Sequence, residues 1–221
     1  STDDKIKYRP FLVKEEKLLL IAMESGKQEE VVEAVRGIVE ECTYNKLNLG
    51  SLPMFDVEYI FLNIRAKSVG EISEVRMLCP DDNETYANAE VNLSEVIVQV
   101  EEGHTNKIEL TDEMGMYMTY PTINSFVTTG ITEVSASNML SIIASCIWQI
   151  YDKKGEEVFD AKDQTTEELI EFVEQLNTTQ FRAVQNFFDT MPKLKHEITI
   201  KNPKTGVESN VMLQGLADFF G

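Results

Sequence analysis

The sequence predicts a mixed α+β protein: a helical body with a small antiparallel β insertion and a C-terminal β-hairpin. Apolar residues recur at every third or fourth position in residues 28–42 and 54–67, which is typical of amphipathic helices. Residues 116–120 follow a period of two, which is typical of a strand. A turn sequence at residues 202–205 separates two short apolar segments and indicates a hairpin. A chain of 221 residues can bury a sizeable core as one large domain or two small ones.

The chain opens with an extended arm that leads into a helix. Pro10 fixes its own φ and moves Arg9 away from the α region, and good helix formers fill residues 14–23. The four consecutive apolar residues at 18–21 would cover more than half of a helix circumference, whereas a surface helix needs one apolar stripe. We therefore expect this helix to be central to a core or buried by more than one neighbour.

Two further helices complete an N-terminal subdomain. Val31, Val35 and Ile38 belong to one apolar stripe in residues 28–42, and Leu62 lies opposite the main apolar face of residues 54–67. Short loops join the three helices. We expect residues 1–69 to form the extended arm plus a helical subdomain.

The pattern changes after Gly70, where about five short strands are predicted. Polar and apolar residues alternate in several short runs, and residues 80–84 form a turn. We expect residues 70–126 to be one antiparallel β insertion.

Residues 127–221 are predicted as a second helical subdomain with a hairpin and an apolar tail. Its helices span residues 138–151, a segment capped by Thr165 with Glu168, and a segment that begins at Thr178 or Thr179. Because exposed paired phenylalanines are costly, the tail at residues 216–220 should dock on the core or on another subunit.

The charge and the cysteine content of the sequence argue against several classes of protein. The net charge of −18 argues against non-specific binding of nucleic acid and suits solubility or a basic protein partner. The sequence has neither an apolar run long enough for a membrane span nor the features of a signal peptide at its start. The three cysteines are far apart and form no disulfide framework, so we expect Cys42 and Cys146 to be buried thiols in a reducing compartment.

The sequence lacks the common motifs of catalytic, phosphate-binding and metal-binding sites. The sequence contains no glycine-rich phosphate loop, no nucleophile elbow and no second histidine after His196 that would form a zinc-protease motif. His104 is predicted to be a solvated loop residue and His196 a strand residue, and the carboxylate pair Glu15-Glu16 is predicted to be a solvated face. Acidic loops that begin at Asp81 and Asp160 lack the glycine and glutamate of a calcium loop. We predict no enzyme activity, no catalytic residue, no bound metal and no cofactor.

Residues 9–20 carry a resemblance to a known family. Their run of arginine, proline, phenylalanine, leucine and valine, followed by lysine, two glutamates, lysine and leucines, resembles the opening of the tail baseplate proteins of T4-like bacteriophages. That family includes the baseplate hub subunit and the hub assembly protein. Residues 214–220 resemble the family's glycine-leucine and double-phenylalanine ending, and Phe187-Phe188 and Met191-Pro192 also fit. In the family a further short segment precedes the motif, so we expect this chain to be a fragment without it.

The resemblance implies a structural component of the hub of a contractile tail baseplate. Such a protein is assembled in the host cytoplasm and binds other baseplate or hub proteins, not nucleic acid or membrane; its oligomeric state stays open. One alternative is a transient hub assembly factor absent from the finished virion, and a different class is a carboxylate-based hydrolase. Ordinary core packing is the alternative role of each candidate contact residue, and these residues are Tyr8, Arg9, Pro10, Phe11, Leu216, Phe219 and Phe220.

Zinc is a separate question, because some relatives carry cysteine knuckles at the β insertion and the last hairpin. At these places this chain has only Cys79 and, in residues 201–206, no cysteine. A structural zinc site needs four sulfur or nitrogen ligands. We therefore predict that packing and turn chemistry alone hold these hairpins.

Overall fold

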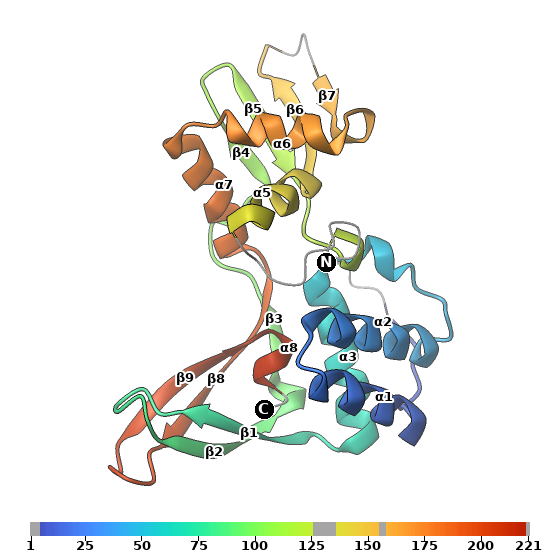
Figure 1. Ribbon diagram of the computed structural model, residues 1–221, viewed down its shortest axis with the longest axis vertical. Coiled ribbons are helices and arrows are strands. Elements are labelled where there is room, and N and C mark those ends of the chain that lie inside the picture. The colour runs from blue at the N-terminus through green and yellow to red at the C-terminus, as the bar shows by residue number, and fades with distance from the viewer. Residues whose placement is uncertain (1–4, 126–135, 155–157, 220–221) are drawn as a thin grey trace.

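The computed structural model describes residues 5–125, 136–154 and 158–219, and it has the mixed α+β architecture that the sequence predicts (Figure 1). The helices of the described part are α1 (Val13–Glu24), α2 (Gln28–Cys42), α3 (Met54–Val69), α5 (Ala136–Ser145), α6 (Thr166–Glu174), α7 (Thr178–Thr190) and α8 (Gly215–Asp218). Its strands are β1 (Ile72–Leu78), β2 (Tyr86–Asn92), β3 (Ile97–Gln99), β4 (Lys107–Glu109), β5 (Met114–Met118), β6 (Ile147–Asp152), β7 (Val158–Asp160), β8 (Lys193–Lys201) and β9 (Glu208–Gln214).

The strands pair in three antiparallel sheets, with orders β1-β2, β3-β8-β9 and β4-β5-β6-β7. The expectation of one β insertion at residues 70–126 is wrong in its pairing, because β3 pairs with β8 and β5 with β6. Alternation of apolar and polar residues identifies a strand but not its partner. Hydrogen bonding therefore joins this region to both later parts of the chain.

The predicted helix at residues 138–151 is also wrong in its second half. Helix α5 begins at Ala136, two residues before the predicted start, and ends at Ser145. The following residues, Ile147–Asp152, form β6 between β5 and β7. Ile147, Trp148, Ile150 and Tyr151 are β-branched or aromatic, which favours a strand. Their pairing with β5 outweighs the helical spacing of the apolar positions.

The capping sequences, in contrast, set helix boundaries as predicted. Thr165 Oγ1 accepts a hydrogen bond from the Glu168 backbone N–H at 3.2 Å, and the Glu168 carboxylate accepts one from the Thr165 backbone N–H at 2.8 Å. This capping box starts α6. The side chain of Asn177 accepts from two backbone N–H groups at the start of α7.

Three hydrophobic cores result, and α3 belongs to two of them. Val57 and Phe61 of α3 pack with α1 and α2, whereas Leu62 and Ala66 pack with the hairpin strands β1, β2, β8 and β9. The position of Leu62 opposite the main apolar face is therefore explained by a second core. The third core lies between the four-stranded sheet and helices α5, α6 and α7, at the other end of the elongated molecule in Figure 1.

Helix α1 is less buried than expected. Figure 1 shows it at the edge of the helical group, beside α2. Its buried residues are Glu15, Leu19 and Ala22, whereas Leu18, Leu20 and Ile21 are each more than half exposed. The prediction that this helix is buried on several sides is wrong, because within this chain α2 and α3 cover only one side of it.

Candidate interaction surfaces

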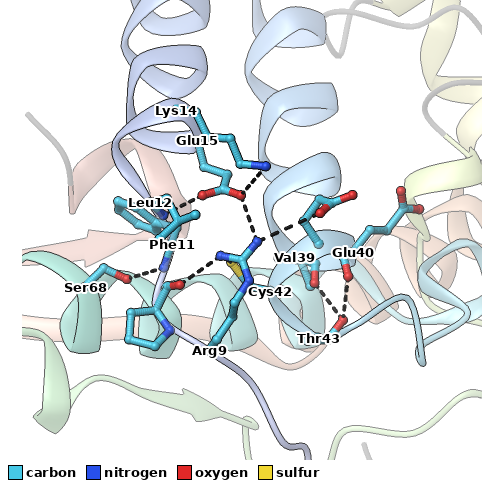
Figure 2. Close-up of polar contacts among 12 residues, drawn as sticks. Arg9, Phe11, Leu12, Lys14, Glu15, Val39, Glu40, Cys42, Thr43 and Ser68 are labelled. Carbon is cyan, nitrogen blue, oxygen red and sulfur yellow. Dashed lines mark hydrogen bonds and ion pairs between the residues drawn. The ribbon is translucent and has the colours of Figure 1, made fainter.

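The N-terminal arm, the part of the resemblance that precedes α1, is fixed by backbone hydrogen bonds (Figure 2). Arg9 N–H donates to the Cys42 carbonyl at the end of α2 at 2.9 Å, and Phe11 N–H donates to Ser68 Oγ of α3 at 2.9 Å. Phe11 is buried among the residues of α1, α2 and α3. The arm therefore lies across the ends of the helices and holds them together.

A buried ion pair completes this corner. Arg9 Nη2 donates to Glu15 Oε1 at 2.8 Å, while the other Glu15 oxygen accepts from the backbone N–H of Leu12, the residue that precedes α1 (Figure 2). The hydrogen bond from Arg9 lowers the pKa of Glu15, and the same bond raises the pKa of Arg9. The expectation of a solvated Glu15 is wrong, since this residue is 3% exposed. The arginine and glutamate of the family motif thus have a structural role.

The seven predicted contact residues occupy different environments. Phe11 and Phe219 are buried in two different cores, so their side chains are not on the surface. Burial of Phe219 agrees with the expectation that the tail docks on the core. Phe220 lies outside the described residues. Tyr8, Arg9, Pro10 and Leu216 are partly or fully exposed.

An open groove that sequence reasoning missed lies between α1 and α2. We call it the α1–α2 groove, a concavity of about 560 Å³. The signal was the run of apolar residues in α1, which exceeds what one neighbour can cover. The groove is lined by Lys14, Glu15, Leu18, Ile21, Ala22, Glu30, Glu33, Ala34, Gly37, Ile38 and Glu41.

A second groove, of about 430 Å³, lies where α2 and α3 meet the segment around Gly215. Glu58 of α3 lies among its mainly apolar lining and accepts a hydrogen bond from the Leu216 backbone. Burial raises the pKa of Glu58 to about 7 despite that hydrogen bond. Lys27 also lines this groove, and its ammonium pairs with Glu30 at 2.8 Å.

The turns of the two hairpins, β1-β2 and β8-β9, meet and are joined by side-chain hydrogen bonds. The buried Asn202 donates through Nδ2 to Asp81 Oδ1 at 2.9 Å and to Asp82 Oδ2 at 3.0 Å. Thr205 Oγ1 donates to Asp81 Oδ2 at 2.6 Å. Hydrogen bonds from Thr205 and Asn202 lower the pKa of Asp81. The turn chemistry that the sequence predicts for these hairpins is therefore present as a hydrogen-bonded junction.

The remaining reactive side chains have structural surroundings. His104 Nδ1 lies 2.9 Å from Thr190 Oγ1 and Nε2 lies 3.0 Å from the Tyr120 hydroxyl, and burial lowers its pKa. The expectation of a fully solvated His104 is wrong, because its ring is partly buried against Tyr120 and against Phe187 of α7. Within residues 5–125, 136–154 and 158–219, no three His, Cys, Asp or Glu side chains gather to hold a metal ion. All three cysteines are free and buried, which confirms the prediction for Cys42 and Cys146.

The fold and these surfaces define a mixed α+β protein whose accessible features are apolar grooves between helices. Such features are typical of proteins that bind other proteins. The whole chain, residues 1–221, matches the model of the T4 bacteriophage base plate protein family, so the chain belongs to this family.

The family defines the protein as a structural component of the phage tail, located in the virion and in contact with other tail proteins. No curated protein and no solved structure matches the chain significantly. Among the helices that the structure describes, none combines the length and the hydropathy needed to cross a bilayer.

Proposed function

We propose that this protein is a structural component of the hub of a contractile tail baseplate, and that it acts through protein–protein contacts in tail assembly. The single observation that supports this most is the family match over the whole chain. The hub assignment rests on the resemblance of residues 9–20 to the hub subunit and the hub assembly protein. Assembly in the host cytoplasm, before the tail is complete, is part of the same proposal.

The surface of the protein supports a role in binding. Leu18, Leu20 and Ile21 are each more than half exposed on one helix. Single exposed apolar residues are ordinary, but a cluster of them on one element marks an interaction site. Three of the accessible candidate contacts from the sequence, Tyr8, Arg9 and Pro10, lie on the arm just before this helix.

A transient assembly factor is the second candidate within the family. An assembly factor would bind the hub through the same surface and then leave. A hydrolase is less well supported, because a carboxylate site of that class needs an acid and a base. Among the carboxylates of the described residues, only Glu58 has a raised pKa, and its neighbours in the groove are mainly apolar.

Mass spectrometry of purified mature tails and of hub assembly intermediates tests the proposal. A fixed stoichiometry in both would support a permanent hub subunit. Presence in intermediates alone would assign the assembly-factor role. Absence from both would overturn the hub proposal.

A further inference from the structure

Glu58 of α3 is an acidic side chain in an apolar groove. We call the groove of about 430 Å³ where α1, α2 and α3 meet the segment around Gly215 the Glu58 groove. Its floor is formed by the core residues Leu19, Val35, Val57, Phe61 and Ile123. Among the described residues that line the groove, only Lys27 and Glu58 carry a charge. Binding pockets for small groups have this volume, about 300–1,000 Å³, and this mainly apolar lining with few polar groups.

The chain supplies no cation to the Glu58 carboxylate. Across the described part of the chain, no ion pair includes Glu58. The ammonium of Lys27 pairs with Glu30 at 2.8 Å. The backbone N–H of Leu216 donates a hydrogen bond to the Glu58 carboxylate, but this donor is uncharged. Because burial disfavours the ionised form, the carboxylate lacks the counter-ion that would stabilise its charge.

The hydrogen bond to Leu216 does not require a charge at position 58. Gly215, with φ of 70°, turns the chain from β9 into α8, and the next residue, Leu216, binds Glu58. The amide oxygen of a glutamine would accept the same hydrogen bond without ionising. An ionisable group that the fold does not need, in a groove that disfavours its charge, is typical of a functional site.

The combination of one carboxylate and an apolar lining favours a cation on an apolar stem. The ammonium of a lysine lies at the end of four methylene groups, so the stem can pack on the lining while the ammonium reaches Glu58. A guanidinium binds best to both oxygens of a carboxylate in parallel, and the Leu216 N–H already occupies part of this carboxylate. An ammonium needs only one oxygen atom. An anion would be repelled by Glu58.

We propose that the Glu58 groove binds the side chain of a lysine from another tail protein, and that the lysine ammonium forms an ion pair with Glu58. The methylene groups of this lysine lie against Val31, Met54 and Leu216, lining residues that are only partly buried in the chain itself. That the lysine belongs to a tail protein rests on the proposed function. The binding of an alkylammonium group does not depend on it.

Two small probes test this chemistry with the full chain at pH 8. n-Butylamine has the four carbon atoms and the ammonium of a lysine side chain, and n-butanol is the matched neutral probe. Binding is followed by NMR of the methyl groups of Val31 and Met54, with Val158 on β7, which is 55% exposed, as the remote control. We expect the ammonium probe to bind at least about tenfold more tightly than the alcohol. Equal affinities, or equal shifts at Val158, would overturn the proposal.

Two variants assign the binding to the Glu58 carboxylate. Glu58→Gln keeps the acceptor for Leu216 and removes the charge, so butylammonium should bind it no better than butanol does, without a lower melting temperature. Lys27→Gln changes the charge of the other ionisable residue in the groove and should change the affinity by less than about twofold, because Lys27 is already paired with Glu30. Much tighter binding to Lys27→Gln would show that Lys27 itself occupies the site, and would overturn the proposal.

The titration of the Glu58 carboxyl group gives a readout that does not depend on affinity. A bound ammonium favours the ionised carboxylate and should lower the pKa of Glu58, whereas bound butanol only excludes water and should raise it. Carbon-13 NMR of the carboxyl carbon measures both shifts. A pKa that rises with both probes would mean that the groove binds apolar groups without an ion pair.

A photo-crosslinking residue at position 54, in the lining of the groove, identifies the source of the lysine in hub assembly intermediates, and position 159 serves as the control. We expect crosslinks from position 54 to one segment of another tail protein, and these crosslinks should be lost when a single lysine of that segment is replaced by methionine. Crosslinks to a second copy of this chain, or crosslinks that survive every such replacement, would overturn the proposal. If the protein is missing from the intermediates, the hub function fails, and the butylamine measurements still decide the chemistry of the groove.

Discussion

Arg9 and Glu15 form an ion pair between the N-terminal arm and the first turn of α1, with 2.8 Å between Nη2 and Oε1. The Glu15 side chain is 4% exposed and that of Arg9 is 25% exposed. A carboxylate this buried is stable only while its donors are present, since an unpaired buried charge is costly. The pair therefore couples the position of the arm to the packing of α1.

Arg9→Ala should lower the free energy of unfolding by about 3 kcal/mol, because it removes the hydrogen-bonded cation of the buried Glu15 carboxylate and leaves only the exposed Lys14, whose Nζ lies 3.5 Å from Glu15 Oε1. Glu15→Gln should cost less, since the amide oxygen still accepts from Leu12. Urea unfolding of both single variants and the double variant measures the coupling. If the losses of stability in the two single variants add up to the loss in the double variant, the two side chains do not interact.

The Arg9–Glu15 pair should make the stability of the protein decrease as the pH falls. The pKa of Glu15 is lowered by its hydrogen bond from Arg9, so the native state holds this proton less tightly than the unfolded chain does. Its stabilisation is present above the unfolded pKa of about 4.3 and is lost as the pH falls toward the folded pKa. Unfolding of wild type and Glu15→Gln at pH 7 and pH 3 should show a larger loss in the wild type.

The contribution of Glu58 to stability depends on pH in the opposite direction to that of Glu15. Its folded pKa of about 7 lies above the unfolded value, so its contribution to stability is full in acid and is lost as the pH rises toward 7. The loss of stability reaches at most about 3 to 4 kcal/mol above pH 7. Glu58→Gln should match the wild type at pH 4 and be more stable at pH 8. An equal difference between the two proteins at both pH values would contradict the raised pKa.

The hairpin junction should depend on a single amide. Asn202→Ala removes the donor to Asp81 and Asp82 and should cost about 2 kcal/mol, because Asn202 is 1% exposed. Asn202→Asp keeps the shape but places a third carboxylate beside two others, so it should be the worse variant at pH 7 and should improve as the pH falls below about 4. Thermal unfolding at both pH values measures this order.

Phe219→Ala should destabilise the protein by about 3 kcal/mol, because it empties a fully buried position in the core of the hairpins. Met212→Ala is the matched control on β9, where Met212 is 47% exposed, and its effect should be within about 0.5 kcal/mol. Urea unfolding compares the two. Similar losses would mean that the tail is not part of the core.

Local patterns predicted the elements well where caps and periodicity agree. Helix α2 has the predicted ends at residues 28 and 42, and Thr165 with Glu168 starts α6. Sequence reasoning failed where partners decide the outcome. Residues 147–152 have helical spacing but become a strand because β5 lies beside them. Likewise, no local pattern shows that β3 pairs with β8, almost a hundred residues away.

The candidate site was harder to predict than the fold. Phe11 and Phe219 were candidates either for partner contacts or for core packing, and the structure buries both. Leu18 and Ile21 were expected to be buried because they belong to a run of four apolar residues, yet both are exposed. Composition identifies an apolar segment, but only the fold determines which of its side chains the chain itself covers.

The Ser73 hydroxyl donates a hydrogen bond of 2.8 Å to the Phe219 carbonyl, across 146 residues. A ribosome that has just made Ser73 needs about 10–30 s more to add Phe219, at the usual rate of synthesis. During that time β1 and β2 lack both β8 and the phenylalanine that closes their core. The core of the two hairpins can therefore close only after the last residues of the described chain have been made.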